Sequence, residues 1–124
     1  MSGNKLFLDT NIILYLLNGD ETIAEILDNK QIYISVVTEL ELLAYPGITD
    51  EEEKAIKNFL SECKIVSINI HIKKEVIRLR KKYKIKLPDT IIIATALFLG
   101  LPLFTADMEL RKVANLPLIF YEID

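Results

Sequence analysis

Apolar and polar positions follow two periods along the chain, one typical of short strands and one typical of helices. Short runs rich in β-branched and aromatic residues predict strands at Lys5–Leu8, Gln31–Ile34, Lys64–Ile68, Leu101–Thr105 and Pro117–Tyr121. Helix-like segments separate these runs. Strands that alternate with helices predict an α/β sandwich built on a mainly parallel sheet.

The helix-like segments have apolar residues at helical spacing and turn residues at their ends. They lie at Thr10–Asn18, Glu21–Asp28, Ser35–Ala44, Asp50–Glu62, Ile72–Tyr83, Asp89–Leu99 and Met108–Ala114. Ser35 is expected to cap its helix, which should turn Val36, Leu40 and Leu43 toward the core. No repeat or linker divides the chain, so residues 1–124 are expected to form a single domain.

The composition is that of a globular protein, with 124 residues, 51% of them hydrophobic and 27% charged. No apolar run reaches the roughly 18 residues that cross a bilayer, and the first residues carry no apolar signal core. The single cysteine, Cys63, excludes an internal disulfide and a cysteine-based zinc site. We expect a soluble, cytoplasmic protein without a membrane partner.

The net charge of −3 does not indicate a nucleic-acid-binding protein, but the basic residues are unevenly distributed. Eight of the 15 lie between Lys73 and Lys86. One interpretation is the solvated face of an amphipathic helix. The other is a surface that contacts RNA phosphates, for which Lys73, Lys74 and Lys81 are the candidates.

Two acids follow predicted strands directly. Asp9 comes after Leu6–Leu8, and Asp107 comes after Leu103–Thr105. Ligands of open α/β sheets bind outside the carboxyl ends of the strands. If these two strands are parallel, Asp9 and Asp107 stand at the same edge of the sheet.

Two more acids lie on predicted helices. Asp89 begins the most apolar helix, where it either caps the helix or belongs to a functional site. Glu41 lies beside the apolar stripe of its helix, where an unpaired carboxylate is costly to bury. Glu39, its neighbour, is expected at the surface.

Four converging carboxylates would repel one another and raise each other's pKa values. A bound divalent cation removes that conflict, and oxygen ligands without His or Cys favour Mg²⁺ or Mn²⁺ over zinc. The metal prediction therefore depends on convergence, which the order of residues alone does not establish.

Four segments resemble the signature blocks of PIN domains in their order and spacing, and together with the helices between them they extend over nearly the whole chain. They are Phe7–Ile12, Ser35–Leu42, Leu87–Ala96 and Leu103–Asp107. The resemblance implies a three-layer α/β/α sandwich with about four to five strands. It also implies a metal-dependent endoribonuclease similar to the VapC toxins of toxin–antitoxin pairs.

The same resemblance assigns the site residues. Asp9, Glu41, Asp89 and Asp107 would be the catalytic and metal-binding acids, Thr105 a supporting hydroxyl and Asn11 an amide that orients Asp9. Glu109 and Leu110 stand where the toxins often have an Asp-Phe pair, so Glu109 is assigned as a helper of Asp107. The implied cofactor is Mg²⁺ or Mn²⁺, and the implied partners are an RNA substrate, a small antitoxin protein and a second copy of the chain in a dimer.

Three other classes of protein are alternatives to a PIN-domain ribonuclease. A phosphatase with an Asp-x-Asp motif would need an acid at Asn11, and a phospho-receiver domain would need its acceptor near Asn69, so neither fits. A PIN-like domain that only binds protein or RNA is the remaining alternative. The four acids argue against it, because clustered carboxylates disfavour both folding and the approach of RNA when no metal is bound.

Overall fold

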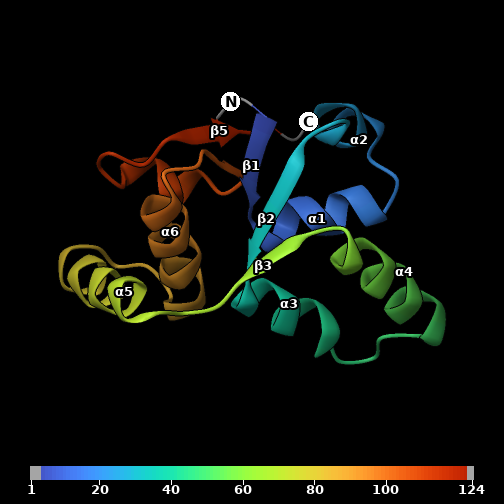
Figure 1. Cartoon of the computed structure of the whole chain (residues 1–124), viewed down its shortest axis with the longest axis horizontal. Helices are drawn as coiled ribbons and strands as arrows, with labels where there is room; N and C mark the ends of the chain where they lie inside the picture. The colour runs from blue at the N-terminus through green and yellow to red at the C-terminus, as the bar shows by residue number, and fades with distance from the viewer. Residues whose placement is uncertain (1–3, 123–124) are drawn as a thin grey trace.

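The computed structural model describes residues 4–122, in which five parallel strands form one sheet between layers of helices (Figure 1). The strands are β1 (Lys5–Leu8), β2 (Gln31–Ser35), β3 (Lys64–Val66), β4 (Leu103–Thr105) and β5 (Leu118–Phe120). Their order across the sheet is β3-β2-β1-β4-β5. This confirms the predicted α/β sandwich and shows that the sheet is parallel throughout.

The helices are α1 (Thr10–Leu17), α2 (Glu21–Leu27), α3 (Val36–Leu43), α4 (Asp50–Ser61), α5 (Ile70–Lys82) and α6 (Leu87–Leu99). Helices α5 and α6 cover one face of the sheet, and α1, α2 and α4 cover the other (Figure 1). Helix α3 follows directly on the carboxyl end of β2. No helix of residues 4–122 is long and apolar enough to cross a membrane.

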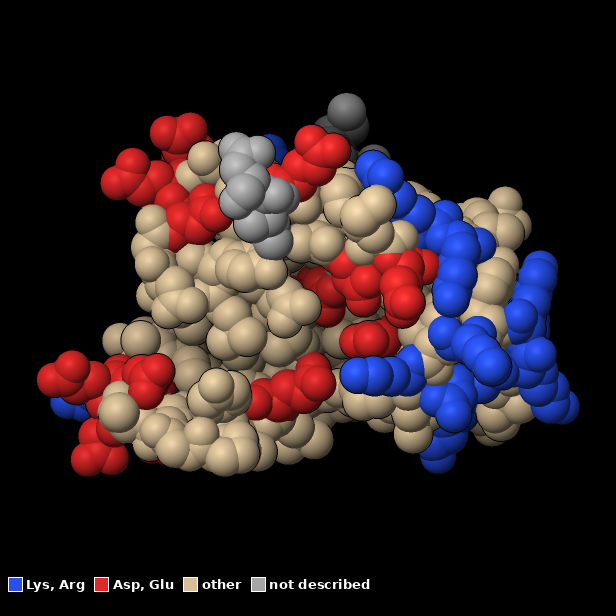
Figure 2. Space-filling view, turned by 180° about the vertical axis from the view of Figure 1, so that it is seen from behind, with Lys and Arg blue, Asp and Glu red and all other residues tan. Residues whose placement is uncertain are grey.

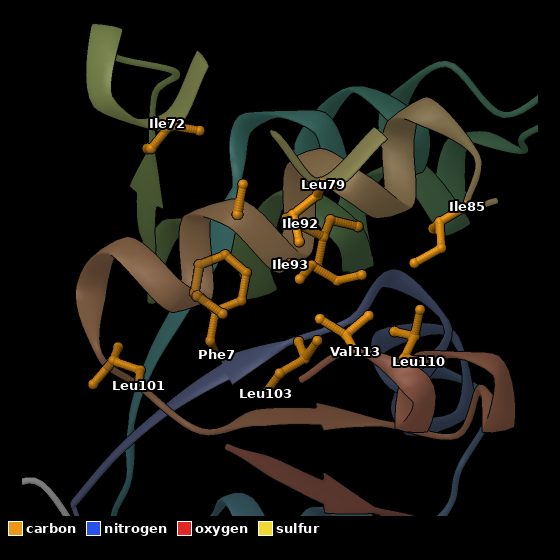
Figure 3. Packing of buried hydrophobic residues seen from close by; sticks show 12 residues of the cluster. Phe7, Ile72, Leu79, Ile85, Ile92, Ile93, Leu101, Leu103, Leu110 and Val113 are labelled. Atoms are coloured by element: carbon orange, nitrogen blue, oxygen red, sulfur yellow. The ribbon is translucent and has the colours of Figure 1, made fainter. Parts of the chain in front are cut away.

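The alternation of side chains along β1 divides the core between the two faces. Phe7 is fully buried and packs among residues of α5 and α6 (Figure 3), whereas Leu6 and Leu8 pack against the helices on the opposite face. Burying a side chain of this size contributes about 1.5–3 kcal/mol. Since strand side chains alternate, Asp9 comes out on the same side as Phe7, which is the side of α6.

Three predicted strands are shorter in the structure: β5 covers Leu118–Phe120 instead of Pro117–Tyr121, and β4 and β3 are shortened for local reasons. Strand β4 begins at Leu103 rather than Leu101, because Pro102 has no N–H to donate to the sheet. Strand β3 ends at Val66 rather than Ile68, because its pairing partner β2 ends opposite at Ser35, where α3 begins. The short helix predicted at 108–114 is a 3₁₀ helix, η2, over Met108–Lys112.

The prediction for the buried face of α3 was wrong for Leu40, whereas Leu43 does pack against the core. Ser35 does cap the helix, because its hydroxyl accepts the N–H of Val37 at 3.0 Å. The residues that are buried, however, are Thr38 and Leu42, and Leu40 is 59% exposed. Thr38 and Leu42 are four positions apart and share one face of a helix that is only eight residues long.

Candidate active site

Asp9 stands where the order of the strands reverses. From β1 the chain proceeds outward to β2 and β3, and it later returns to place β4 on the other side of β1. Such a switch point is where open parallel sheets bind ligands. The backbone N–H of Asp9 donates to the carbonyl of Phe104 at 3.0 Å, which aligns the ends of β1 and β4.

The carboxylate of Asp9 is buried, with 5% of the residue exposed, and both of its oxygens accept hydrogen bonds. Oδ1 accepts the N–H of Thr10 at 2.8 Å, and Oδ2 accepts the hydroxyl of Thr105 at 2.7 Å. Burial raises the pKa of Asp9, the two hydrogen bonds oppose that rise, and the charges of Asp107 and Glu41 add to it. The carboxylate is therefore held in a fixed orientation near other negative charge.

Glu41 reaches the same site from α3. Its Oε1 accepts the hydroxyl of Thr10 at 2.8 Å, and that hydroxyl also lies 3.0 Å from the hydroxyl of the buried Thr38. Thr10 thus connects Asp9 to Glu41, through its N–H on one side and its hydroxyl on the other. The side chain of Glu41 is exposed, which leaves its second oxygen open to solvent.

Asp107 is joined to Asp9 through Thr105. The hydroxyl of Thr105 donates to Asp9 and accepts the N–H of Asp107 at 3.0 Å. Oδ1 of Asp107 in turn accepts the N–H of Glu109 at 3.0 Å and caps η2. The side chain of Glu109 is exposed, so the contact of Glu109 with Asp107 is made by its backbone.

Asp89 lies in the first turn of α6 and does not cap it. The N-cap position is Lys86, and no side chain caps this helix. The pKa of Asp89 is raised to about 6 by burial and by the charges of Asp9, Asp107 and Glu41, while the charge of Lys86 opposes the rise. The charge of each of the other three acids acts on Asp89, so the four acids lie within electrostatic range of one another.

The donor set suits a hard cation. The four side chains offer only carboxylate oxygens, and each of the two most perturbed, Asp9 and Asp89, would be relieved by positive charge. Within residues 4–122, no group of three or more His, Cys, Asp or Glu side chains is placed so that it could hold a metal ion. Mg²⁺ still fits these acids, because it keeps several waters and needs one or two carboxylates from the protein.

Some of the expected residues lie elsewhere. Asn11 is exposed, and its side chain makes no hydrogen bond to Asp9, although both residues belong to the described part of the chain. The orientation of Asp9 comes instead from Thr10 and Thr105. Lys73 and Lys74 lie near the start of α5, away from the acids, whereas Lys81 lies near its end.

Sequence reasoning missed three residues of the site, which are Thr10, Thr38 and Lys86. Attention to acids alone passes over hydroxyl groups. Thr10 follows Asp9 directly, and Thr38 precedes Glu41 by three positions, so it shares a helix face with that acid. Lys86 precedes Asp89 by the same interval, a spacing that could have revealed the pair.

The two other side chains with catalytic potential lie outside this group. His71 stacks on Phe98 with ring centroids 5.8 Å apart. Burial raises the pKa of the Cys63 thiol to about 12, and its Sγ donates to the carbonyl of Phe59. A thiol with so high a pKa is a poor nucleophile, so Cys63 is not a candidate for nucleophilic catalysis.

Comparison with known proteins identifies the family and the fold. The family model for the PIN domain matches residues 6–116. A toxin–antitoxin complex from Klebsiella pneumoniae contains a chain that is 30% identical, with a TM-score of 0.83, and the match covers 95% of this chain and 99% of that one. No curated protein sequence matches at a significant level.

More distant structures share the fold. A chain of VapBC2 from Rickettsia felis, bound to a DNA fragment from its promoter, is 23% identical over 95% of this chain and 99% of that one, with a TM-score of 0.85. A chain of VapBC-1 from nontypeable Haemophilus influenzae is 24% identical over 94% and 97%, with a TM-score of 0.76. From the extent of the family match, we conclude that this chain belongs to the PIN-domain family.

Proposed function

We propose that the protein is a Mg²⁺- or Mn²⁺-dependent endoribonuclease and the toxin component of a VapBC-type toxin–antitoxin pair. The observation that carries the proposal is the convergence of Asp9, Glu41, Asp89 and Asp107 where β1 and β4 end. The similarity to chains of toxin–antitoxin complexes supports the second part. We propose a cytoplasmic location as well, because the proposed RNA substrate and the proposed protein inhibitor would both be found there.

The roles of the acids follow from their positions. A bound Mg²⁺ or Mn²⁺ would supply the means to activate water and to neutralise charge on the phosphate. Asp9 and Asp89 would hold it, because burial and neighbouring negative charge raise the pKa of each, and a cation would offset both effects. Glu41 and Asp107 would complete the site or orient the attacking water. Thr105 would keep Asp9 and Asp107 in register through its shared hydroxyl.

A cleavage assay tests the nuclease proposal. Wild-type protein should cleave single-stranded RNA in Mg²⁺ or Mn²⁺ and should not cleave it in EDTA. Asp89→Asn should abolish cleavage, whereas Asp50→Asn, on the exposed start of α4, should not. RNA binding without cleavage by the wild type, at any metal concentration, would instead support a catalytically silent binding module.

The structure also offers a place for a protein partner beside the acids. A hollow of about 200 Å³ lies between α1, α3 and α4, with Thr10 and Glu41 at one side. Its apolar lining comprises Leu14, Leu42, Tyr45, Ile48 and Ile56. Tyr45 is 59% exposed, which leaves a large aromatic surface uncovered. We propose that an antitoxin segment fills this hollow and directs a basic side chain toward Glu41 and its neighbours.

Co-purification from the native host tests the partner, and Tyr45→Ala provides the variant. The substitution should weaken the complex and leave RNA cleavage by the free protein intact. Size-exclusion chromatography with light scattering on the same samples would report whether the free chain is the expected dimer. Recovery of the protein alone at native expression, with no growth defect on overexpression, would contradict the toxin role.

A further inference from the structure

Basic side chains gather around the turn that joins α5 to α6. A hollow of about 370 Å³ is lined there by Arg80, Tyr83, Lys84, Ile85 and Lys86. We call these five residues the α5–α6 corner. Three of them are cationic, and none is acidic. The hollow therefore has the chemistry of an anion site rather than of an apolar groove.

The backbone of the corner is held in place by contacts from three directions. Arg80 Nη1 donates to the carbonyl of Ile85 at 2.9 Å, and Lys112 Nζ donates to the carbonyl of Lys84 at 3.3 Å. The hydroxyl of Tyr83 accepts the N–H of Ala114 at 2.9 Å. Ile85 is buried in the core, while Lys84 and Lys86 on either side of it are exposed. A fixed backbone thus presents two free ammonium groups.

The corner adjoins the acids. Lys86 is the N-cap of α6, one turn before Asp89, and its charge lowers the pKa of that acid. The start of α6 has no side-chain cap, so the positive end of the helix dipole adds to the charge of the lysines. Figure 2 shows the same relation at the surface, with basic side chains gathered beside a central group of acidic ones.

The other end of α5 is too far away to serve the same site. His71, near the start of α5, stacks on Phe98, near the end of α6, so the two helices run antiparallel. Phe98 lies nine residues beyond Asp89, or about 14 Å along the helix axis. Lys73 and Lys74 therefore lie roughly one helix length from the acids, and the corner is the part of the basic run that adjoins them.

We propose that the α5–α6 corner binds a backbone phosphate of the RNA next to the bond that is cleaved, through Lys84 and Lys86. Arg80 is a positioning residue, because its guanidinium donates to the backbone carbonyl of Ile85 within the corner. The inference rests on the proposed ribonuclease function. The sequence offers Lys73, Lys74 and Lys81 as RNA contacts. The inference instead places the contact at the carboxyl end of α5 and in the turn that follows it.

A salt series with matched double variants tests the inference. Binding of a short single-stranded RNA to Asp9→Asn protein would be measured in EDTA, with Lys84→Gln/Lys86→Gln and with Lys73→Gln/Lys74→Gln. Each pair removes two exposed positive charges, and both pairs belong to the stretch of basic residues between Lys73 and Lys86. Losing the contact with that one phosphate should flatten the dependence of log affinity on log salt by about 0.7 in the corner variant. The control pair should keep the slope, and Lys84→Arg/Lys86→Arg should restore it.

Each other outcome has a definite meaning. An unchanged slope in Lys84→Gln/Lys86→Gln, or an equal loss in both Gln pairs, would overturn the inference. So would weakened partner binding with unchanged RNA binding, which would make the corner a protein interface. Cleavage of RNA by the wild type is measured separately. If the wild type cleaves RNA but the corner variant keeps its salt dependence, the inference about the corner fails while the proposed ribonuclease function stands. Equal melting temperatures would establish that the variants fold.

Discussion

A buried carboxylate needs hydrogen-bond donors, and those of Asp9 come from its neighbours in space and in sequence. Thr105 is fully buried and uses one hydroxyl twice, as a donor to Asp9 and as an acceptor from Asp107. A hydrogen bond to a charged group contributes about 1.5–3 kcal/mol. Thr105 is therefore expected to matter for stability as well as for the site.

Thr105→Val should lower the free energy of unfolding by about 2 kcal/mol at neutral pH, because it leaves one oxygen of Asp9 without its donor. The loss should shrink in acid, where Asp9 is protonated. Thr105→Ser keeps the hydroxyl and loses one methyl, at a cost of about 1 kcal/mol. Urea unfolding of the two variants checks this, and a Ser variant as unstable as the Val variant at neutral pH would contradict it.

Asp89 gives a pH prediction for the metal-free protein. Its pKa is raised from 3.8 to about 6 in the fold, so between these pH values the folded state binds more protons than the unfolded state. The contribution of Asp89 to the free energy of unfolding therefore falls as pH rises from about 4 to about 6. Asp89→Asn should be more stable than the wild type at pH 7, by about 1 kcal/mol after allowance for solvent screening.

The comparison requires urea unfolding in EDTA near pH 4 and near pH 7. The advantage of Asp89→Asn should be present at the higher pH and small at the lower one. An advantage of the same size at both values would mean that the effect is one of packing rather than of charge.

The sequence made the four acids candidates, because two of them follow predicted strands, Asp89 begins the most apolar helix and Glu41 lies beside a predicted apolar stripe, and the family resemblance grouped them. It could not supply their contacts. Thr10 and Thr38 are neutral residues whose importance depends on where α1 and α3 meet. Asn11 is next to the site in sequence, but it is exposed and makes no hydrogen bond to Asp9.

At the scale of elements, the start of α4 is determined by residues that are close together in the sequence. Thr49 Oγ1 accepts the N–H of Glu52 at 3.1 Å, and Glu52 Oε1 accepts the N–H of Thr49 at 3.0 Å, which together form a capping box. Helix α4 also forms one wall of the hollow beside Glu41. The cap thus fixes the end of an element that the proposed partner contacts.

Thr49→Ala should lower the free energy of unfolding by about 1 kcal/mol, because the N–H of Glu52 loses its acceptor. Thr49→Ser should stay close to the wild type. Thermal or urea unfolding distinguishes them, and equal destabilisation by Ala and Ser would show that the methyl group of Thr49, rather than its hydroxyl, stabilises α4.

Helix α3 shows where local pattern fails. Its sequence offers apolar residues on more than one face, and only packing against neighbouring elements selects the face with Thr38 and Leu42. The sequence pattern is equally insufficient for the basic residues between Lys73 and Lys86. These residues look alike in sequence, but the antiparallel packing of α5 and α6 brings only the last part close to Asp89.

For the whole molecule, the decisive fact is the order of the strands. A sequence pattern predicts strands but does not say which are neighbours, and convergence of Asp9 with Asp107 requires β4 to lie beside β1. The family resemblance grouped Asp9 with Asp107, but the order of the strands was not predicted. Overall charge is similarly uninformative, because a net charge of −3 averages an acidic centre with the basic α5–α6 corner.

The central claim is that the converged carboxylates bind a divalent cation. Titration with Mn²⁺, followed by electron paramagnetic resonance of the free ion, measures this directly. Wild-type protein should remove Mn²⁺ from solution, and so should the charge-matched control Asp50→Asn/Glu51→Gln on the exposed start of α4. Asp9→Asn/Asp89→Asn should lose that binding while remaining folded. Equal Mn²⁺ binding by this double variant and the wild type would contradict the account.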